Sequence, residues 1–530
     1  MNREPTDRSD DSLLLSIDSG TQSVRALVFD LRGNLVAISK VALDPLSAPE
    51  PGWAEQDVEV TWQRTCDACQ RLWSESGELR DRIVGMAVTS QRGTVVNVDS
   101  QGQPLRPAIS WLDQRRANKL SPLGGVWDVL FRVIRQEELI KLFRCQAESN
   151  WLRTEQPNIW RQTEKYLLLS GFLHHRLCGE FVDSVACQVG YLPFNYQKQS
   201  WCSGWDWKWR ATGIEQNHLP RLVKAGTQLG RVSREAAQET GLPEGLPIIA
   251  AAADKACEVI GSGCLTPDQA AISYGTTATI NTTSSRYVEA IRLLPAYPSA
   301  IPGSYCTEVQ VFRGFWMVNW FKQQFGLAER LESEQSGEAP EFLFDKMITD
   351  VPPGSMGLML QPYWTPGIKL PGPEAKGSII GFGDVHGREH VYRAMLEGLA
   401  YGLRDGAEQI QKRSGGAIKS LRVSGGGSQS DQMMQITADV FGLPAERPHT
   451  FETSGLGAAI VTAVGLGLYP DFDSAMTSMA HVKDRFEPHR DAQQIYDQLY
   501  RQVYRKMYGR LSPLFHSIQQ ITGYPAIEND

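Results

Sequence analysis

The sequence predicts an α/β protein whose two related domains face each other across a cleft. A chain of 530 residues is too long for a single hydrophobic core. A strand, a turn containing Gly-Thr and a second strand occur around 17–30 and again around 272–280, about half the chain later. A repeat at that separation indicates two related domains.

The first repeat begins with a buried strand from Leu13 and continues into a second strand at 26–30. The turn Asp18-Ser19-Gly20-Thr21 joins these strands, and a third strand follows at 35–38. Glycine lets backbone N–H groups approach phosphate oxygens, hydroxyls add donors, and a carboxylate holds Mg²⁺ through water. The turn therefore suits a phosphate and a hydrated metal ion, and an ordinary hairpin with a glycine turn is the alternative.

The second repeat places Gly275 and Thr276 between two apolar strands. Two Gly-Thr turns that face each other across a cleft could hold the two ends of a triphosphate. The repeat therefore favours a nucleotide site over two unrelated hairpins.

The first half continues with a helix at 58–76 and a strand at 83–89. A second strand at 94–98 is expected to form a hairpin with it, and Gln91 and Arg92 lie at the corner. Two helices are expected within 151–177, broken by Gln156-Pro157-Asn158. Four tryptophans lie within 201–209, where a loop packed on the domain surface is favoured over a ligand clamp.

Asp254 comes directly after an apolar strand at 247–253 and opens a helix that runs towards Ile260. A carboxylate at a helix N-terminus is stabilised in its ionised form by the helix dipole. This suits a base that must accept a proton from a hydroxyl, and an N-cap aspartate is the alternative. The run Gly261-Ser262-Gly263 is expected to mark a hinge between the domains.

The second half contains a short strand at 358–361 and a helix at 390–413 with one apolar face. Between them, the Pro- and Gly-rich stretch 362–377 is expected to reach over the cleft or into a dimer contact. A strand at 421–423 runs into three successive glycines, more than a plain strand-to-helix turn needs. Helices at 431–441 and 453–466 follow.

Composition excludes several classes of function. The formal net charge is −7 and no basic block stands out, so nucleic acid and anionic membranes are poor partners. No apolar run is long enough to span a bilayer. The 9 cysteines are scattered, and only Cys66 and Cys69 form a close pair. We expect buried thiols in a cytoplasmic protein, in preference to a metal or redox site.

Six segments along the chain resemble the FGGY carbohydrate kinase family, which includes xylulokinases and glycerol kinases. The resemblance covers about residues 13 to 470 and rests on the two phosphate turns, on Trp111-Leu112-Asp113-Gln114-Arg115, on Ala253-Asp254-Lys255-Ala256, on Ser424-Gly425-Gly426-Gly427-Ser428 and on Leu456-Gly457-Ala458-Ala459. It implies an actin-like, ribonuclease-H-like pair of domains with ATP in the central cleft. The expected boundaries are a disordered tail at 1–11, domains at 12–262 and 263–515, and a tail at 516–530.

The resemblance also implies roles for individual residues. Asp254 is expected to be the catalytic base, and Asp18 is expected to hold Mg²⁺ through water. The expected nucleotide contacts are Thr21, Gln22, Ser23, Arg25, Gly275, Thr276, Gly425, Gly426, Gly427 and Ser430. The expected substrate contacts are Gln91, Arg92, Trp111, Asp113, Asp254 and Lys255. A homodimer is the expected assembly.

The chain departs from the family pattern at several places. Gly93 stands where glycerol kinases have Glu, Gly314 is the one glycine in the nucleotide loop near 313–318, and the usual Lys before the Trp-Leu pair is missing at Trp151. Lys255 replaces the common Gln or Glu, so we expect it to meet a carbonyl or carboxylate of the substrate or to pair with Glu258 or another acid.

Three alternatives stay open at this point. The Gln91-Arg92 corner suggests a glycerol-like polyol as the substrate, whereas the Trp111 segment suggests a ketopentose. Asp113 and Arg115 could instead form a purely structural pair. A non-catalytic nucleotide-binding regulator on the same fold is the alternative to an ATP-dependent kinase that phosphorylates a primary hydroxyl.

Overall fold

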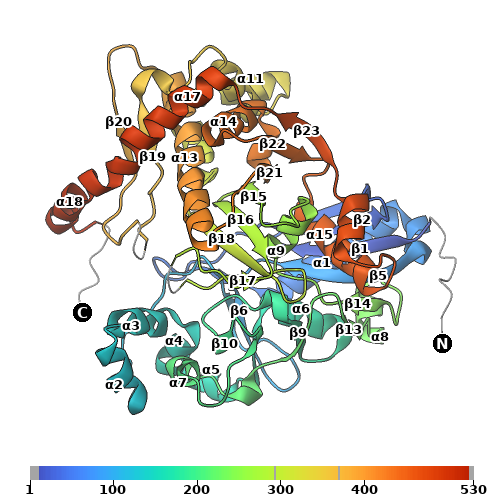
Figure 1. Ribbon diagram of the computed structural model, residues 1–530. Helices are drawn as coiled ribbons and strands as arrows, with labels where there is room; N and C mark the ends of the chain where they lie inside the picture. Colours follow the sequence, from blue (N-terminus) through green and yellow to red (C-terminus); the bar gives the residue numbers. More distant parts are fainter. Residues whose placement is uncertain (1–10, 292–293, 368–370, 525–530) are drawn as a thin grey trace.

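Two large sheets dominate the computed structural model, which describes residues 11–291, 294–367 and 371–524 (Figure 1). The first has six strands in the order β13-β14-β5-β1-β2-β3. Their bounds are β1 Leu13–Ser19, β2 Ser23–Asp30, β3 Leu35–Ala42, β5 Ile83–Ser90, β13 Gln228–Arg231 and β14 Pro247–Ile249. Strands β1, β2 and β3 are antiparallel neighbours, and β5 runs parallel to β1 on its other side.

The second sheet repeats this pattern. It has seven strands in the order β17-β18-β16-β15-β21-β22-β23. Their bounds are β15 Gln269–Tyr274, β16 Ala278–Ser284, β17 Tyr297–Pro298, β18 Tyr305–Val311, β21 Ser420–Ser424, β22 Ala445–Pro448 and β23 Val482–Phe486. Strands β15, β16 and β18 are antiparallel neighbours, and β21 runs parallel to β15. The two sequence repeats are thus the central hairpins of two sheets with the same core topology.

Two helices lie between the sheets, α9 (Asp254–Gly261) and α15 (Thr453–Gly465). They approach so closely that a Cβ on Gly261 would lie 1.9 Å from the Thr453 carbonyl oxygen, and one on Gly457 would lie 1.9 Å from that of Cys257. Glycine is therefore required at both positions, and small residues in α15 let the two sheets share one apolar cluster.

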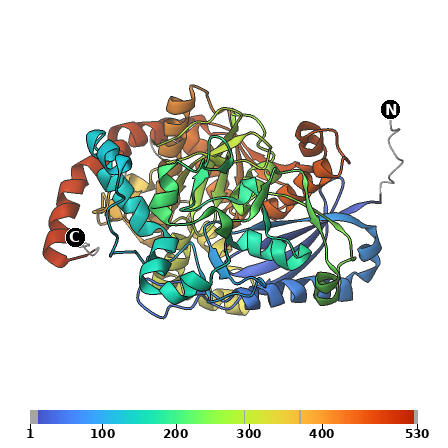
Figure 2. The same ribbon diagram turned by 90° about the horizontal axis from the view of Figure 1, so that it is seen from below.

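Helix α1 (Val58–Glu75) covers the first sheet from outside (Figure 2). The Asp57 side chain accepts hydrogen bonds from the N–H groups of Glu59 and Val60 and so caps the helix. Helix α13 (Arg388–Ser414) packs against the second sheet, and α14 (Asp431–Phe441) follows the glycine segment. All three helices confirm the positions predicted from sequence.

We call the part of the chain that holds the six-stranded sheet the first unit and the part that holds the seven-stranded sheet the second unit. A smaller region extends from the first unit. Its sheet has the order β4-β7-β6-β8, with bounds β4 Glu55–Gln56, β6 Val95–Val98, β7 Ala108–Ile109 and β8 Lys165–Leu168. Around it lie α2 Val126–Val133, α3 Glu137–Gln146, α4 Glu148–Glu155, α5 Pro157–Gln162, α6 Leu169–Cys178 and α7 Trp207–Thr212.

Two predictions for this region are wrong. Strand β6 does not form a hairpin with β5, because β5 joins the large sheet and β6 joins the small one. The stretch 151–177 is not two helices, because Lys165–Leu168 forms a strand paired with β6. A short apolar run fits a buried strand as well as a helix, so periodicity did not separate the two.

The tryptophan run does not form a single loop. Trp201 is in β11 (Ser200–Trp201), Trp207 and Trp209 are in α7, and Trp205 is 91% exposed. Trp207 packs edge-on against Phe131 and Phe143, so the run mainly anchors α7 on the small helices.

The remaining helices are α8 Arg234–Thr240, α10 Trp316–Phe325, α11 Leu327–Ser336, α12 Pro340–Met347, α16 Phe472–Met479, α17 Arg490–Leu499 and α18 Arg505–Thr522, and the remaining short strands are β9 Val182–Ser184, β10 Phe194–Asn195, β12 Arg221–Val223, β19 Met359–Gln361 and β20 Ser378–Ile380. The predicted loop 362–377 lies between β19 and β20, and its residues 368–370 fall outside the described residues.

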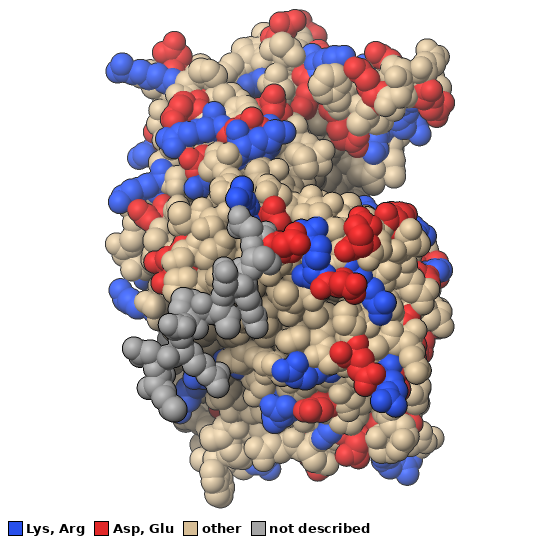
Figure 3. All heavy atoms as spheres, turned by 90° about the vertical axis from the view of Figure 1, so that its right-hand side faces the viewer, with Lys and Arg blue, Asp and Glu red and all other residues tan. Residues whose placement is uncertain are grey.

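The last two features of the fold are the charge of its surface and the hydropathy of its helices. Figure 3 shows Lys and Arg interspersed with Asp and Glu over the face in view, without a large block of one sign. Within the described residues, no helix combines the length and the apolar character needed to cross a membrane.

Candidate active site

The first turn places Asp18 near the end of β1, where its side chain is almost fully buried. The turn is closed by the Gly20 N–H, which donates to the Ser23 carbonyl oxygen at 3.1 Å. Thr21 donates its hydroxyl to Oε1 of Gln91, which follows β5. The β1–β2 turn and the corner after β5 are therefore in contact.

Arg25 lies opposite Asp18 in the hairpin register. Its Nη1 is 3.2 Å from Asp18 Oδ2 and 3.0 Å from Glu452 Oε2, just before α15. The guanidinium predicted to bind phosphate thus bridges two carboxylates, one from each half of the chain. Thr21 lies at the turn, whereas Gln22 and Ser23 lead into β2.

Burial raises the pKa of Asp18 to about 7. The Arg25 charge lowers this pKa, whereas the charges of Asp254, Glu452 and Glu258 raise it. Four acidic side chains therefore lie close enough to act on one another, and a cation added among them would be attracted strongly.

Asp254 is the first residue of α9, and Ala253 holds the N-cap position. The Oδ1 atom of Asp254 accepts a hydrogen bond from the Lys255 N–H at 2.7 Å. Burial raises the pKa of Asp254, while the charges of Lys255 and Arg92 lower it. Asp254 is only partly buried, and its charge acts on Asp18. A carboxylate with a raised pKa is a candidate general base.

Lys255 does not point into open space. Its Nζ is 2.7 Å from Glu258 Oε2 and 2.9 Å from Ser273 Oγ on β15. Of the two expectations for Lys255, the structure shows the pairing with Glu258. The other Glu258 oxygen accepts the Ser424 hydroxyl at 2.8 Å, which ties α9 to β21.

Arg92 follows β5 and reaches across to the second sheet. Its Nη2 is 2.9 Å from Glu308 Oε1 on β18, and its guanidinium lies over the Tyr297 ring at 5.3 Å. The Trp111 indole N–H donates to Thr21 Oγ1 at 3.1 Å and to Gln91 Oε1 at 3.2 Å. Thr21, Gln91 and Trp111 therefore form one contiguous group beside Asp18.

Asp113 stands apart from this group. Its side chain is 3% exposed, and both oxygens are engaged: Oδ1 accepts from Arg115, while Oδ2 accepts the Ala54 N–H at 2.6 Å and Arg115 Nη2 at 2.7 Å. In this arrangement Asp113 and Arg115 form the structural pair that the sequence left open.

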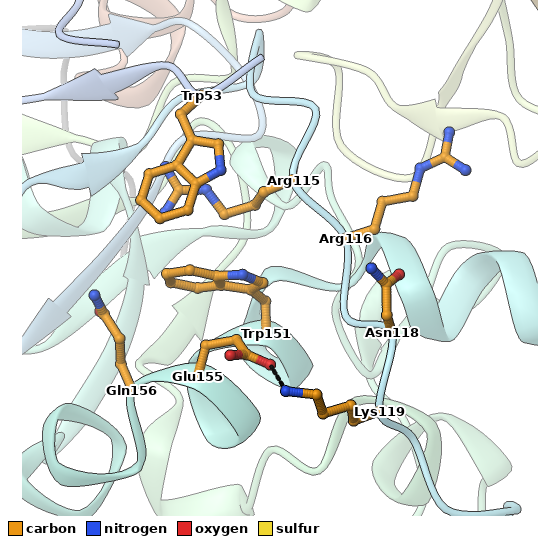
Figure 4. A pocket seen from close by; sticks show the side chains of 8 residues that line it. All are labelled: Trp53, Arg115, Arg116, Asn118, Lys119, Trp151, Glu155 and Gln156. Atoms are coloured by element: carbon orange, nitrogen blue, oxygen red, sulfur yellow. Dashed lines mark ion pairs between the residues drawn. The ribbon is translucent and has the colours of Figure 1, made fainter. Parts of the chain in front are cut away.

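Arg115 is itself stacked between aromatic rings, as Figure 4 shows. Its guanidinium lies 3.9 Å from the Trp53 ring centroid and 4.5 Å from that of Trp151. These residues line a pocket of 560 Å³ with an ion pair between Lys119 and Glu155 at 3.8 Å. None of the predicted catalytic or nucleotide-binding residues lines this pocket.

The second turn, with Gly275 and Thr276, is braced by the segment before α10. The N–H groups of Gly314 and Phe315 donate to the Thr276 and Gly275 carbonyl oxygens, both at 2.9 Å. A Cβ on Gly314 would lie 2.3 Å from the Ala278 nitrogen, so only glycine fits there. Gly314 therefore supports the turn directly.

The glycines after β21 differ in what surrounds them. Gly425 has φ +79° and approaches the Tyr274 backbone, where a Cβ would lie 2.9 Å from the carbonyl carbon. A Cβ on Gly427 would meet the Phe315 ring at 2.3 Å, whereas Gly426 has open space around it. Ser430 caps α14 by accepting the Met433 N–H at 3.0 Å. The segment thus brings bare backbone beside the second turn.

Glu308, Glu452, Ser273 and Ser424 contribute contacts that the sequence motifs did not identify. Glu308, Glu452 and Ser424 lie far from their partners in sequence, as with Arg25 and Glu452, which are 427 residues apart, whereas Ser273 lies 18 residues from Lys255. An i, i+3 spacing of opposite charges was the only local signal, and it pointed to Glu258.

Comparison with known proteins agrees with this arrangement. Residues 13–261 match the N-terminal domain, and residues 270–466 the C-terminal domain, of the FGGY family of carbohydrate kinases. The chain is 32% identical to the uncharacterized sugar kinase YgcE of Escherichia coli strain K12, covering 91% of each chain. It is 30% identical to a glycerol kinase of Dechloromonas aromatica, covering 91% of this chain and 94% of the relative.

A solved structure of similar fold is the xylulose kinase from Rhodospirillum rubrum. It is 25% identical and superposes with a TM-score of 0.78 over 95% of this chain and 100% of that chain. The predicted pair of actin-like domains is confirmed by this likeness and by the repeated sheet topology. The chain belongs to the FGGY family of carbohydrate kinases.

Proposed function

We propose that this protein transfers the γ-phosphoryl group of ATP to a primary hydroxyl of a small sugar or polyol. The observation that supports this most directly is the position of Asp254. Its partly buried carboxylate begins α9, lies near enough to Asp18 for the two charges to interact and is linked through Lys255 to β15, which carries the second turn. A base between two turns suited to phosphates is the arrangement that hydroxyl phosphorylation requires.

In the reaction, Asp254 accepts the proton of the substrate hydroxyl. The hydroxyl oxygen then forms a bond to the γ-phosphorus, the bond from that phosphorus to the β,γ-bridging oxygen breaks, and ADP leaves with the electron pair. Positioning and charge neutralisation supply most of the rate. The N–H groups and hydroxyls of the two turns and the Arg25 guanidinium would hold the phosphates.

The acids around Asp18 fit a magnesium ion bound with the nucleotide. Mg²⁺ prefers oxygen ligands and commonly uses one or two carboxylates together with waters and phosphates. Within the described residues no cluster of three or more His, Cys, Asp or Glu side chains could hold a metal alone. Asp18 would therefore hold the ion through water, and when bound the ion would neutralise phosphate charge.

Gln91, Arg92, Trp111 and Lys255 are the proposed substrate contacts, together with Asp254. Trp111 offers an apolar ring to a carbon chain. The relatives named glycerol kinase and xylulose kinase support a polyol or a ketopentose as the substrate. Asp113 would reach a substrate only if its bonds to Arg115 and Ala54 were broken. The adenosine is proposed to lie against Gly425, Gly426, Gly427 and Ser430. The space for it is beside Gly426, which has no close neighbour.

A cytoplasmic location and a homodimer complete the proposal. All 9 cysteines lie in the described part of the chain and are free, which is typical of a reducing compartment. Sedimentation velocity at several protein concentrations tests the dimer.

The deciding experiment measures ADP release against a panel of sugars and polyols at fixed Mg·ATP. A kinase should show turnover that one class of substrate stimulates strongly. A non-catalytic regulator would bind ATP but release no more ADP with any member of the panel than without it, and that result would refute the proposal.

A further inference from the structure

A second hollow of 330 Å³ lies where the first unit meets the turn between β17 and β18. Its floor is apolar and includes Val185, Ala186 and Ala225, which are nearly or fully buried. Its charged lining residues are Lys198 and Lys224, and no Asp or Glu is among the described residues that line it. The pocket therefore carries positive charge only, in a chain of net charge −7.

Both units build the walls of this pocket. The β10–β11 turn from the first unit carries Lys198 and Gln199. From the second unit, the β17–β18 turn carries Ser299, Pro302 and Gly303, and β18 begins with Tyr305. Gln199 Nε2 donates to the Ser304 carbonyl oxygen at 2.8 Å, and the Tyr305 hydroxyl donates to the Gln197 carbonyl oxygen at 2.5 Å. These bonds hold the two turns together.

Gln199 has φ +51°, in the left-handed region that residues with a Cβ adopt at a cost. In this conformation the Gln199 side-chain amide donates a hydrogen bond to Ser304, which belongs to the second unit. The wall of the pocket is therefore a defined structure and not a loose surface loop.

Neither lysine is neutralised by the protein. In the part of the chain that the structure describes, the ammonium groups of Lys198 and Lys224 have no carboxylate partner within ion-pair distance. Lys255, by contrast, is paired with Glu258. Two unpaired cations over a partly apolar floor attract a small anion and give it charge-assisted hydrogen bonds.

The pocket lies next to the candidate active site but has its own lining. The Ala186 carbonyl oxygen, at the pocket, accepts the N–H of Ala253, the residue before Asp254, at 3.2 Å. Val185 belongs to the same apolar cluster as Tyr297, whose ring contacts Arg92. No residue that lines the pocket belongs to the proposed catalytic, nucleotide or substrate set.

We infer that this pocket binds a small phosphate-type anion, which joins the two units across the β17–β18 turn. The shared chemistry is a tetrahedral oxyanion held by Lys198 and Lys224, supplied by inorganic phosphate or by the phosphate group of a small ester. Because the walls come from both units, a bound anion stabilises their arrangement. The inference does not depend on the proposed reaction, since it concerns binding alone.

The test is footprinting of lysines on the intact protein with an amine-reactive reagent, read by peptide mass spectrometry. Inorganic phosphate and glycerol 3-phosphate are the probes, added in separate arms, and sodium chloride at equal ionic strength controls for screening. Lys483, on the edge strand β23 far from the pocket in sequence, is the internal reference. Phosphate should slow labelling of Lys198 and Lys224 together and leave Lys483 unchanged.

Single variants sharpen the test. Lys198→Gln should weaken the protection of Lys224 by about tenfold in probe concentration, the scale of one charge-assisted hydrogen bond. Lys224→Gln should do the same for Lys198, and Lys483→Gln should change neither.

The arms also separate the sources of the anion. Protection by inorganic phosphate alone assigns a free anion, and protection by glycerol 3-phosphate alone assigns an ester. Equal protection by sodium chloride, equal protection of Lys483, or no protection by either probe would overturn the inference.

Discussion

The Lys255 ammonium lies 2.7 Å from the Glu258 carboxylate, one turn further along α9. Because Lys255 also contacts Ser273 and Glu258 also accepts from Ser424, the pair joins the helix that carries Asp254 to two parallel strands of the second sheet. The pair also sets the charge around Asp254, since the Lys255 charge lowers the pKa of that carboxyl and the Glu258 charge raises it.

Lys255→Gln should therefore raise the pKa of Asp254 further, because an attractive charge is lost. The acidic limb of the kcat/KM profile should move to higher pH, and the preference among sugars and polyols should change. The measurement is the pH profile on the best substrate together with the substrate panel, with Lys483→Gln as the matched control. Profiles identical to wild type in both assays would show that Lys255 acts on neither the base nor the substrate.

Glu258→Gln should shift the same limb in the opposite direction. It removes a negative charge near Asp254 and leaves the Lys255 charge uncompensated, so the pKa of Asp254 should fall. Gln keeps an oxygen that can accept the Ser424 hydroxyl, which preserves the link to β21. A shift to higher pH, or a loss of rate with no shift, would mean that the carboxylate only supports the packing of α9.

Local spacing in the sequence predicts several features that the structure contains. The Gly-Thr turns, the start of α9 at Asp254 and the glycines before α14 all combine an apolar strand with a characteristic turn, and the structure has these elements where they were expected. These patterns depend on neighbours within a few residues, which is the range that turn and helix preferences report.

The contacts that join the two halves could not be found in this way. Arg25 meets Glu452, and Arg92 meets Glu308, 216 residues away. No spacing rule links such positions, so the phosphate-binding prediction for Arg25 did not include its contact with Glu452. Asp113 is a case in which local spacing fits two roles. An Asp two residues before an Arg suits a substrate contact or an internal ion pair equally well, and the burial of both side chains is what favours the ion pair.

Asp18→Ala should greatly reduce turnover with Mg·ATP and leave the fold intact. Asp18 is the acid of the first turn, so its loss removes the proposed anchor for the hydrated metal ion. Turnover as a function of Mg²⁺ concentration measures the effect, and circular dichroism checks the fold. Near-normal turnover with unchanged Mg²⁺ dependence would show that the metal assignment is wrong.

Asp18→Asn should show how much the buried charge of Asp18 lowers the free energy of unfolding when no ligand is bound. The folded-state pKa of about 7 is above the ordinary value of 3.8, so wild type loses stability relative to the Asn variant as pH rises from about 4 to about 7. Above about pH 7 the Asn variant should be more stable by up to about 4 kcal/mol, and near pH 4 the two should be equal. Urea unfolding at both pH values tests this, and a variant less stable at high pH would contradict it.

Asp254→Asn should abolish phosphoryl transfer and spare nucleotide binding. Asn keeps the shape of the side chain and one acceptor oxygen, but it cannot take a proton at neutral pH. The nucleotide residues lie on other elements, around the β1–β2 turn, the β15–β16 turn and the segment after β21. The change should therefore reduce kcat and leave the affinity for Mg·ATP nearly unchanged.

The size of the Asp254→Asn effect follows from general-base catalysis, which typically contributes about a hundredfold to ten-thousandfold. Burial raises the pKa of Asp254, so wild type should lose activity as pH falls through that pKa, and the variant should lack this acidic limb. Steady-state kinetics give kcat and the pH profile, and calorimetric titration with Mg·ATP gives the affinity. If the variant kept more than about a tenth of the wild-type kcat, far above the range for loss of a base, Asp254 would serve only to begin α9 and another group would have to accept the proton.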